Sequence, residues 1–148
     1  MVIINTPHNP TGAVLTHEDL TRFGSGEACA KELYERTGLG PKDFQVAMLY
    51  DHFTPLVLPQ FEEFGFCAAG EAKDFIADGN IEVGGGLPIN TNGGQLGEAY
   101  IHGMNGIAEG VRQVRGTSVN QVDGAVNVLV TSGSGVPTSG LVLSSEGG

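Results

Sequence analysis

The sequence contains few cysteines, and those present are not arranged as a disulfide framework or a zinc site. Cys29 and Cys67 lie far apart and outside any CxxC spacing, whereas both kinds of site need more ligands at closer spacing. The four histidines show no HExxH-like pairing either, so no metal is expected. We expect the two cysteines to be buried, unreactive thiols.

Long apolar runs are also missing. No stretch approaches the roughly 20 residues that a membrane-spanning helix needs, and the N-terminus lacks the charged and apolar regions of a signal peptide. These absences predict no membrane association and a cytoplasmic location. With 148 residues, of which 40% are hydrophobic, the chain has the composition of about one globular domain.

Basic residues are scarce. Seven Lys and Arg stand against 17 Asp and Glu, which gives a formal net charge of −10. Such a chain repels phosphate backbones, and no local Lys/Arg cluster offsets this repulsion. Nucleic acid is therefore not expected as a partner.

The first 23 residues read as a strand, a turn and the start of a helix. Val2–Asn5 is continuous and β-branched, as in a buried strand, and the turn formers of Pro7–Gly12 follow it. The motif Pro-His-Asn-Pro-Thr-Gly resembles that of fold-type I aminotransferases, in which the residue matching Asn9 helps to hold the cofactor or substrate. The resemblance stops at residue 23.

Gly24-Ser25-Gly26 predicts a flexible linker. The chain is thus predicted to have three parts: an aminotransferase-like fragment over 1–23, a linker over 24–26 and a separate domain over 27–148. This division leaves open that the chain is a non-catalytic fusion or chimera. We expect residues 1–23 to stand apart from the core.

The domain over 27–148 alternates helical and strand patterns, as α/β proteins do. Apolar residues recurring every three or four positions from Leu96 to Val114 give the strongest helix signal. The last two strands are expected to form an antiparallel pair. The expected helices are 27–37, 54–64, 71–78 and 96–114, and the expected strands are 44–49, 125–130 and 140–144.

Three short segments carry the candidate site. They are Tyr50-Asp51-His52-Phe53 at a strand end, the stretch from Asn92-Gly93-Gly94 to His102-Gly103, and the Gly/Ser loop 131–135. Their order and spacing resemble the C-terminal half of thiolases, closest to the sterol-carrier-protein thiolases and the thiolase-like aldolases of bacterial steroid side-chain degradation. The resemblance implies an α/β fold with a mixed β-sheet and helices on both faces.

In the sterol-carrier thiolases the first segment reads His-Asp-Cys-Phe, so Tyr50 stands at the histidine position. Tyr100 falls where that family has its catalytic histidine, and the Gly/Ser loop here has no cysteine. Claisen cleavage needs a thiolate and a histidine, whereas retro-aldol cleavage needs only proton transfer and stabilisation of an enolate. The two tyrosines therefore favour the aldolase branch.

The resemblance implies retro-aldol cleavage of a β-hydroxyacyl-CoA, such as a steroid side-chain intermediate, with Tyr50 and Tyr100 as catalytic residues. It also implies a homodimer, a small OB-fold partner protein and no cofactor beyond the acyl-CoA substrate. Because the other half of a thiolase site is not in this sequence, we expect the chain to be inactive alone. The residues expected to line the site are Asp51, His52, Asn92, Gly94, His102, Ser132 and Gly133.

Two further interpretations remain open. Acyl transfer, as in true thiolases, is disfavoured because the cysteine and histidine are missing at the matched positions. Purely structural roles are also open for individual residues. Tyr100 could be a packed side chain, and Asp51 could cap a turn. The Gly/Ser loop could be a simple hairpin connection, or the backbone N–H groups of Gly133–Gly135 could stabilise an oxyanion.

Overall fold

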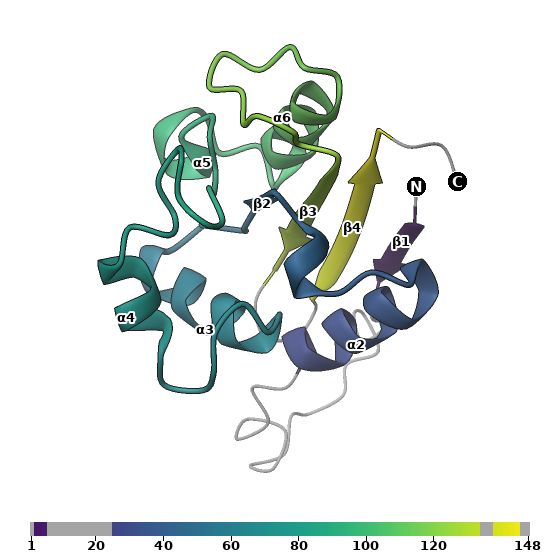
Figure 1. Ribbon diagram of the computed structural model, residues 1–148, viewed down its shortest axis with the longest axis vertical. Coiled ribbons are helices and arrows are strands. Elements are labelled where there is room, and N and C mark those ends of the chain that lie inside the picture. Colours follow the sequence, from purple (N-terminus) through teal and green to yellow (C-terminus); the bar gives the residue numbers. More distant parts are fainter. Residues whose placement is uncertain (1, 6–24, 134–137, 146–148) are drawn as a thin grey trace.

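The computed structural model describes residues 2–5, 25–133 and 138–145. Figure 1 shows a curved sheet with helices packed on it. The helices are α2 (Ser25–Thr37), α3 (Val57–Glu63), α4 (Ala72–Ala77), α5 (Gly94–Gly97) and α6 (Met104–Val114), with short 3-10 turns at Pro41–Asp43 and Thr54–Leu56. The strands are β1 (Val2–Asn5), β2 (Val46–Met48), β3 (Asn127–Ser132) and β4 (Ser139–Ser144).

The sheet is mixed and has the strand order β1-β4-β3-β2. β2 runs parallel to β3, with Val46 opposite Val128, and β3 and β4 form the antiparallel pair that the sequence predicts. β1 pairs antiparallel with β4 and closes the other edge, with Val2 opposite Val142. The strand predicted at 2–5 is thus present, but it joins this sheet instead of standing apart from it.

Helices cover both faces of the sheet, as the sequence predicts. Successive side chains of a strand point to opposite faces, and here both faces are apolar. One face packs against α2 and α3 through a core that includes Cys29, Leu33, Ala47, Phe61, Phe64, Leu129 and Val142. The other packs against α6 through Val46, Met48, Val128, Val130, Leu141 and Leu143.

Glycine lets α6 lie close to the sheet. A Cβ on Gly110 would lie 2.8 Å from Leu143 Cδ1 and 3.1 Å from Val130 Cγ2, so a larger residue would push the helix away. The close approach fixes the N-terminal end of α6 beside the ends of β2 and β3. The candidate site forms around that end.

The helix predicted over 96–114 is wrong in its first half. The chain forms the short α5, then a link over 98–103, and α6 begins only at Met104. The break comes at two consecutive residues with left-handed backbone, His102 at φ 53° and Gly103 at φ 83°, which cannot continue a right-handed helix. The apolar period misleads because Leu96 and Tyr100 are exposed and not part of a buried stripe.

Other boundaries differ less. α2 begins at Ser25, so Ser25 and Gly26 are helical residues and not a flexible linker. The strand expected at 44–49 is shortened to Val46–Met48, and β3 runs from Asn127 to Ser132 instead of 125–130. Among the residues that the structure describes, no helix is long and apolar enough to cross a membrane.

Candidate functional site

The site begins where β2 ends. Asn90 holds this end by accepting a hydrogen bond from the Leu49 N–H (2.8 Å) and donating one to the Leu49 carbonyl oxygen (3.0 Å). The side-chain amide thus satisfies the backbone in the way that a neighbouring strand would. Carboxyl ends of parallel strands are common places for functional groups, and Tyr50 comes next along the chain.

Two buried polar side chains fix the backbone of Tyr50. The Tyr50 N–H donates to Thr131 Oγ1 at 2.8 Å, and Gln60 Nε2 donates to the Tyr50 carbonyl oxygen at 2.8 Å. Thr131 Oγ1 in turn donates to Gln60 Oε1 at 2.6 Å. Both groups are almost fully buried, where a satisfied network of this kind rigidifies the backbone it contacts.

Asp51 builds the next part of the site by holding the turn before α5. Its Oδ1 accepts a hydrogen bond from the Gln95 N–H at 2.9 Å. Gly94 lies directly under this carboxylate, with φ at 63° and no room for a Cβ, which would overlap Asp51 Oδ2. Asn92 also stabilises the turn, because its Oδ1 accepts from the Gly94 N–H at 3.1 Å.

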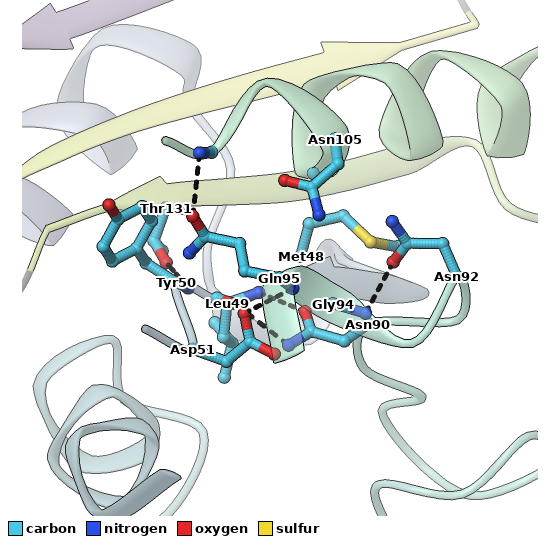
Figure 2. Close-up of a pocket in the computed structure, with 12 residues that line it drawn as sticks. Met48, Leu49, Tyr50, Asp51, Asn90, Asn92, Gly94, Gln95, Asn105 and Thr131 are labelled. Carbon is cyan, nitrogen blue, oxygen red and sulfur yellow. Dashed lines mark hydrogen bonds between the residues drawn. The ribbon is translucent and has the colours of Figure 1, made fainter. Parts of the chain in front are cut away.

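Gln95 connects the α5 turn to the start of α6 (Figure 2). Its Oε1 accepts a hydrogen bond from the Gly103 N–H at 3.1 Å. The Tyr50 ring lies against the same glycine, since a Cβ on Gly103 would be 3.3 Å from Tyr50 Cε2. Tyr50, Gln95 and Gly103 therefore meet around one small cavity.

Tyr50 and Tyr100 bring their hydroxyl groups together. Burial raises the pKa of Tyr50 above its ordinary value, the hydrogen bond with Tyr100 and the charge of that residue raise it further, and the Gln95 amide opposes this rise. Tyr50 is half-buried, whereas Tyr100 on the link between α5 and α6 is 53% exposed. The pair thus presents two hydroxyls, one inside and one at the surface, that can exchange a proton.

The two histidines expected at the site flank these tyrosines. The His52 ring lies 4.7 Å from the Tyr50 ring, and the His102 ring lies 5.0 Å from the Tyr100 ring in an edge-to-face arrangement. His102 also lines a second open pocket, of about 120 Å³, between β3, β4 and the start of α6. Each histidine ring therefore lies close to one of the two tyrosine rings.

The Gly/Ser loop is shorter than expected. Thr131 and Ser132 are the last residues of β3, and Ser132 lines the second pocket beside His102. Gly133 follows at φ 80° and lines neither pocket. Residues 134 and 135, for which backbone N–H donors were predicted, lie outside the described residues.

The cysteines and acidic groups do not add a second reactive centre. Cys29 is a buried free thiol whose pKa burial raises to about 11, and Cys67 is a partly buried free thiol. Both belong to the α2 and α3 side of the sheet, and neither lines the pockets described here. Within the described ranges, no three His, Cys, Asp or Glu side chains come together as a metal site would require.

A comparison of the sequence with protein families gives a match to one family. Residues 8–144 match the profile described as thiolase C-terminal domain-like. The chain belongs to this family. The match begins inside the segment for which the sequence resembles aminotransferases, and that second resemblance stays a prediction.

The thiolase-like domain has close relatives among steroid-degrading proteins. It is 72% identical over 116 residues to a steroid side-chain-cleaving aldolase of Thermomonospora curvata, covering 78% of this chain and 30% of that protein. It is 74% identical over 113 residues to the 17-hydroxy-3-oxo-4-pregnene-20-carboxyl-CoA lyase of Mycobacterium tuberculosis, covering 76% of this chain and 29% of the lyase. A rat sterol carrier protein 2 is 32% identical over 107 residues, covering 70% of this chain and 20% of that protein.

A solved structure shares the same fold. The Ltp2-ChsH2(DUF35) aldolase superposes with a TM-score of 0.79 at 70% identity, covering 80% of this chain and 31% of that one. The thiolase-like domain thus spans about 30% of the length of the two steroid-degrading relatives.

Several residues that build the site were not predicted from the sequence. Asn90 meets a backbone group 41 positions away along the chain, and Gln60 and Gln95 meet backbone groups 10 and 8 positions away. Glu109 of α6 is buried and accepts hydrogen bonds from Thr91 (2.6 Å) and Ser118 (2.5 Å). A Gln or Glu at a position on the apolar face of a helix is the sequence feature that could have indicated a buried polar side chain. Such a feature does not indicate which backbone group the side chain contacts.

Proposed function

We propose that this chain is the C-terminal half of a thiolase-like acyl-CoA retro-aldolase, which cleaves a carbon–carbon bond in the side chain of a steroid β-hydroxyacyl-CoA. The observation that carries the proposal is the contact between the Tyr50 and Tyr100 hydroxyls at the end of a parallel strand. The high identity to proteins named as steroid side-chain-cleaving aldolase and steroid acyl-CoA lyase supports the same reaction.

The proposed reaction needs one group to take a proton and another to give one. A base removes the proton of the β-hydroxyl, the bond between Cα and Cβ breaks, and its electron pair forms the enolate of the thioester. An acid then protonates Cα, which releases a ketone and a shorter acyl-CoA. No nucleophile, oxidant or reductant is required, and the proton count balances because the proton lost from oxygen equals the one gained at carbon.

The environments of the two tyrosines suit different roles. The raised pKa of Tyr50 keeps its hydroxyl protonated near neutral pH, which suits a proton donor to the enolate. The more exposed Tyr100 lies beside the Tyr50 hydroxyl and is open to the surface, where a substrate hydroxyl could reach it. Tyr100 is accordingly proposed as the base, and proton return from Tyr100 to Tyr50 resets the site.

A thiolase-type acyl transfer is less well supported. It needs a thiolate at the reacting carbonyl, but both cysteines of the sequence lie on the α2 and α3 side of the sheet. The raised pKa of Cys29 also keeps its thiol protonated. These observations favour cleavage by proton transfer.

The net charge of −10 bears on how acyl-CoA binds. The phosphates of CoA are normally met by basic groups or helix N-termini, so the proposed substrate would take most of its phosphate contacts from outside this chain. A homodimer and a small OB-fold partner protein are proposed from the resemblance to the thiolase-like aldolases. The DUF35 component named with the solved relative supports a protein partner.

The decisive experiment uses a full-length protein that carries this half and is assayed with a 17-hydroxy steroid 20-carboxyl-CoA for release of ketone and acyl-CoA. Tyr50→Phe and Tyr100→Phe each keep the ring and remove the hydroxyl, so turnover should fall by about 10²- to 10⁴-fold while folding changes little. Tyr34→Phe is the matched control, because the Tyr34 hydroxyl only donates to the Phe64 carbonyl oxygen in the α2 layer. Near-normal turnover of Tyr100→Phe would refute the proposed reaction.

A further inference from the structure

The side-chain amide of Gln95 has a fixed orientation. The Gly103 N–H can only donate, so the atom of Gln95 that faces it must be the oxygen. The nitrogen of the same planar group is thereby directed to the opposite side. The side chain is 6% exposed, and its Nε2 is buried with no hydrogen-bond partner within reach in the part of the chain that the structure describes.

An unpaired buried donor destabilises the folded state relative to a donor that has a partner. The other two buried glutamines show how this fold normally treats such groups. Gln60 and Gln113 use both their oxygen and their nitrogen in hydrogen bonds. Gln95 is the exception among the three, and such an exception in a small cavity calls for an explanation.

The amide end of Gln95 lies near Tyr50. Figure 2 shows the end of the Gln95 side chain extending toward the Tyr50 ring. Both residues line the same cavity, and the Tyr50 ring rests against Gly103. The amide also opposes the rise in the pKa of Tyr50 that burial and Tyr100 cause, as a donor aimed at the phenolic oxygen does.

We propose that Gln95 is a positioning residue of this site, whose amide nitrogen donates a hydrogen bond to the Tyr50 oxygen when that hydroxyl loses its proton. The role in catalysis rests on the proposed function, because Tyr50 is its proton donor. A phenolate left behind in the cavity needs a donor. Its charge favours a closer approach of the Tyr50 oxygen to the unpaired Nε2, which belongs to the same cavity. The unpaired donor of the resting state is then satisfied in the state that follows proton transfer.

Other groups also face Tyr50 and must be separated from Gln95 in a test. Asp51 and His52 follow it in the chain, Tyr100 contacts its hydroxyl, and His102 lies beside Tyr100. All of these residues are retained in a Gln95 variant. The effect of Gln95 can therefore be read as a difference between variant and wild type.

The test measures tyrosine ionisation in the 148-residue chain and needs no substrate. Near-ultraviolet absorbance of tyrosinate is followed from about pH 8 to about pH 11.5, with circular dichroism recorded at each pH to confirm folding. Tyr34 stays silent in this range because burial raises its pKa far above the ordinary value. The transition that disappears in Tyr50→Phe identifies Tyr50.

Two Gln95 variants and one control variant test whether Gln95 lowers the pH at which Tyr50 ionises. Gln95→Glu keeps an oxygen for the Gly103 N–H but removes the donor, and it should raise the Tyr50 transition by about one pH unit or more. Gln95→Met removes the donor without adding charge and should raise it by about half a unit. Leu96→Glu places the same charge on the neighbouring exposed position of α5 and should leave the transition unchanged.

An unchanged transition in either folded Gln95 variant would overturn the proposal. So would a shift of equal size in Leu96→Glu and Gln95→Glu, because general charge would then explain it. If Gln95→Met does not fold, the difference in the Tyr50 transition between Gln95→Glu and Leu96→Glu still tests the proposal. Failure here leaves the turnover assay of the tyrosine variants untouched, so the two proposals can fail separately.

Discussion

Replacing Gly94 with alanine perturbs the contact on which the turn before α5 depends. Gly94 has φ at 63°, in the left-handed region, and an added Cβ would overlap Asp51 Oδ2 and lie 2.7 Å from Asp51 Cγ. The carboxylate would have to move, and it would then lose its hydrogen bond from the Gln95 N–H. One methyl group should therefore damage both the backbone and the Asp51 contact.

The expected cost has two parts. A non-glycine residue in left-handed backbone costs roughly 1–2 kcal/mol, and loss of a hydrogen bond to a charged group costs about 1.5–3 kcal/mol. Gly94→Ala should therefore lower the free energy of unfolding by about 2.5–5 kcal/mol. In an Asp51→Ala background only the backbone part remains, so the two substitutions should show a coupling of about 1.5–3 kcal/mol.

Urea unfolding of the four proteins of this double-mutant cycle gives the coupling directly. Gly97→Ala is the matched control, because Gly97 lies in the same α5 turn and an added Cβ there meets nothing within 4 Å. Its effect should be close to zero or slightly stabilising. Equal costs for Gly94→Ala and Gly97→Ala, or additive effects of Gly94→Ala and Asp51→Ala, would refute the role given to Asp51.

Two more predictions concern charge and assembly. Burial, together with the charges of Glu27 and Glu62, raises the pKa of Glu63 from 4.5 to about 7. The contribution of Glu63 to the free energy of unfolding is therefore fully present below pH 4.5 and is lost as the pH rises to about 7. Glu63→Gln should accordingly raise the free energy of unfolding at pH 8 by about 1–3 kcal/mol and leave it nearly unchanged at pH 4. Urea unfolding at the two pH values measures this difference. The same pH dependence in the variant and the wild type would contradict the prediction. Apolar side chains are exposed at Phe53, Leu96 and Met104 and favour self-association. Sedimentation should therefore show a dimer or a larger species at micromolar protein concentration. A monomer at every concentration would count against the proposed homodimer.

The outline of the fold could be predicted from local patterns. Continuous apolar runs mark strands that are covered on both faces, and this is how β2, β3 and β4 are built. The antiparallel pairing of β3 with β4 follows from their closeness in sequence. Boundaries were less certain, because helix and strand ends depend on hydrogen bonds from elsewhere, such as that from the Val126 N–H to Gln45 Oε1.

Periodicity failed where backbone conformation overrode it. Leu96 and Tyr100 fit a helical repeat with Ile107 and Val111, yet left-handed backbone at His102 and Gly103 divides the segment. The site depends on that division, since it moves Tyr100 off a helix face and onto the link beside Tyr50. A period in apolar residues reports only which positions could share a face, not whether the backbone between them remains helical.

By itself, the sequence determined the α/β class, the two tyrosines as candidates and the family that their spacing resembles, because these depend on residue type and order along the chain. Only the tertiary structure decided how the site is held. Asn90 reaches Leu49 across 41 positions, Thr131 reaches Tyr50 across 81, and Asp51 reaches Gln95 across 44. Such pairings are set by the crossing of β2, β3 and α5 in space, and no local pattern specifies which distant backbone group a buried amide or carboxylate will meet.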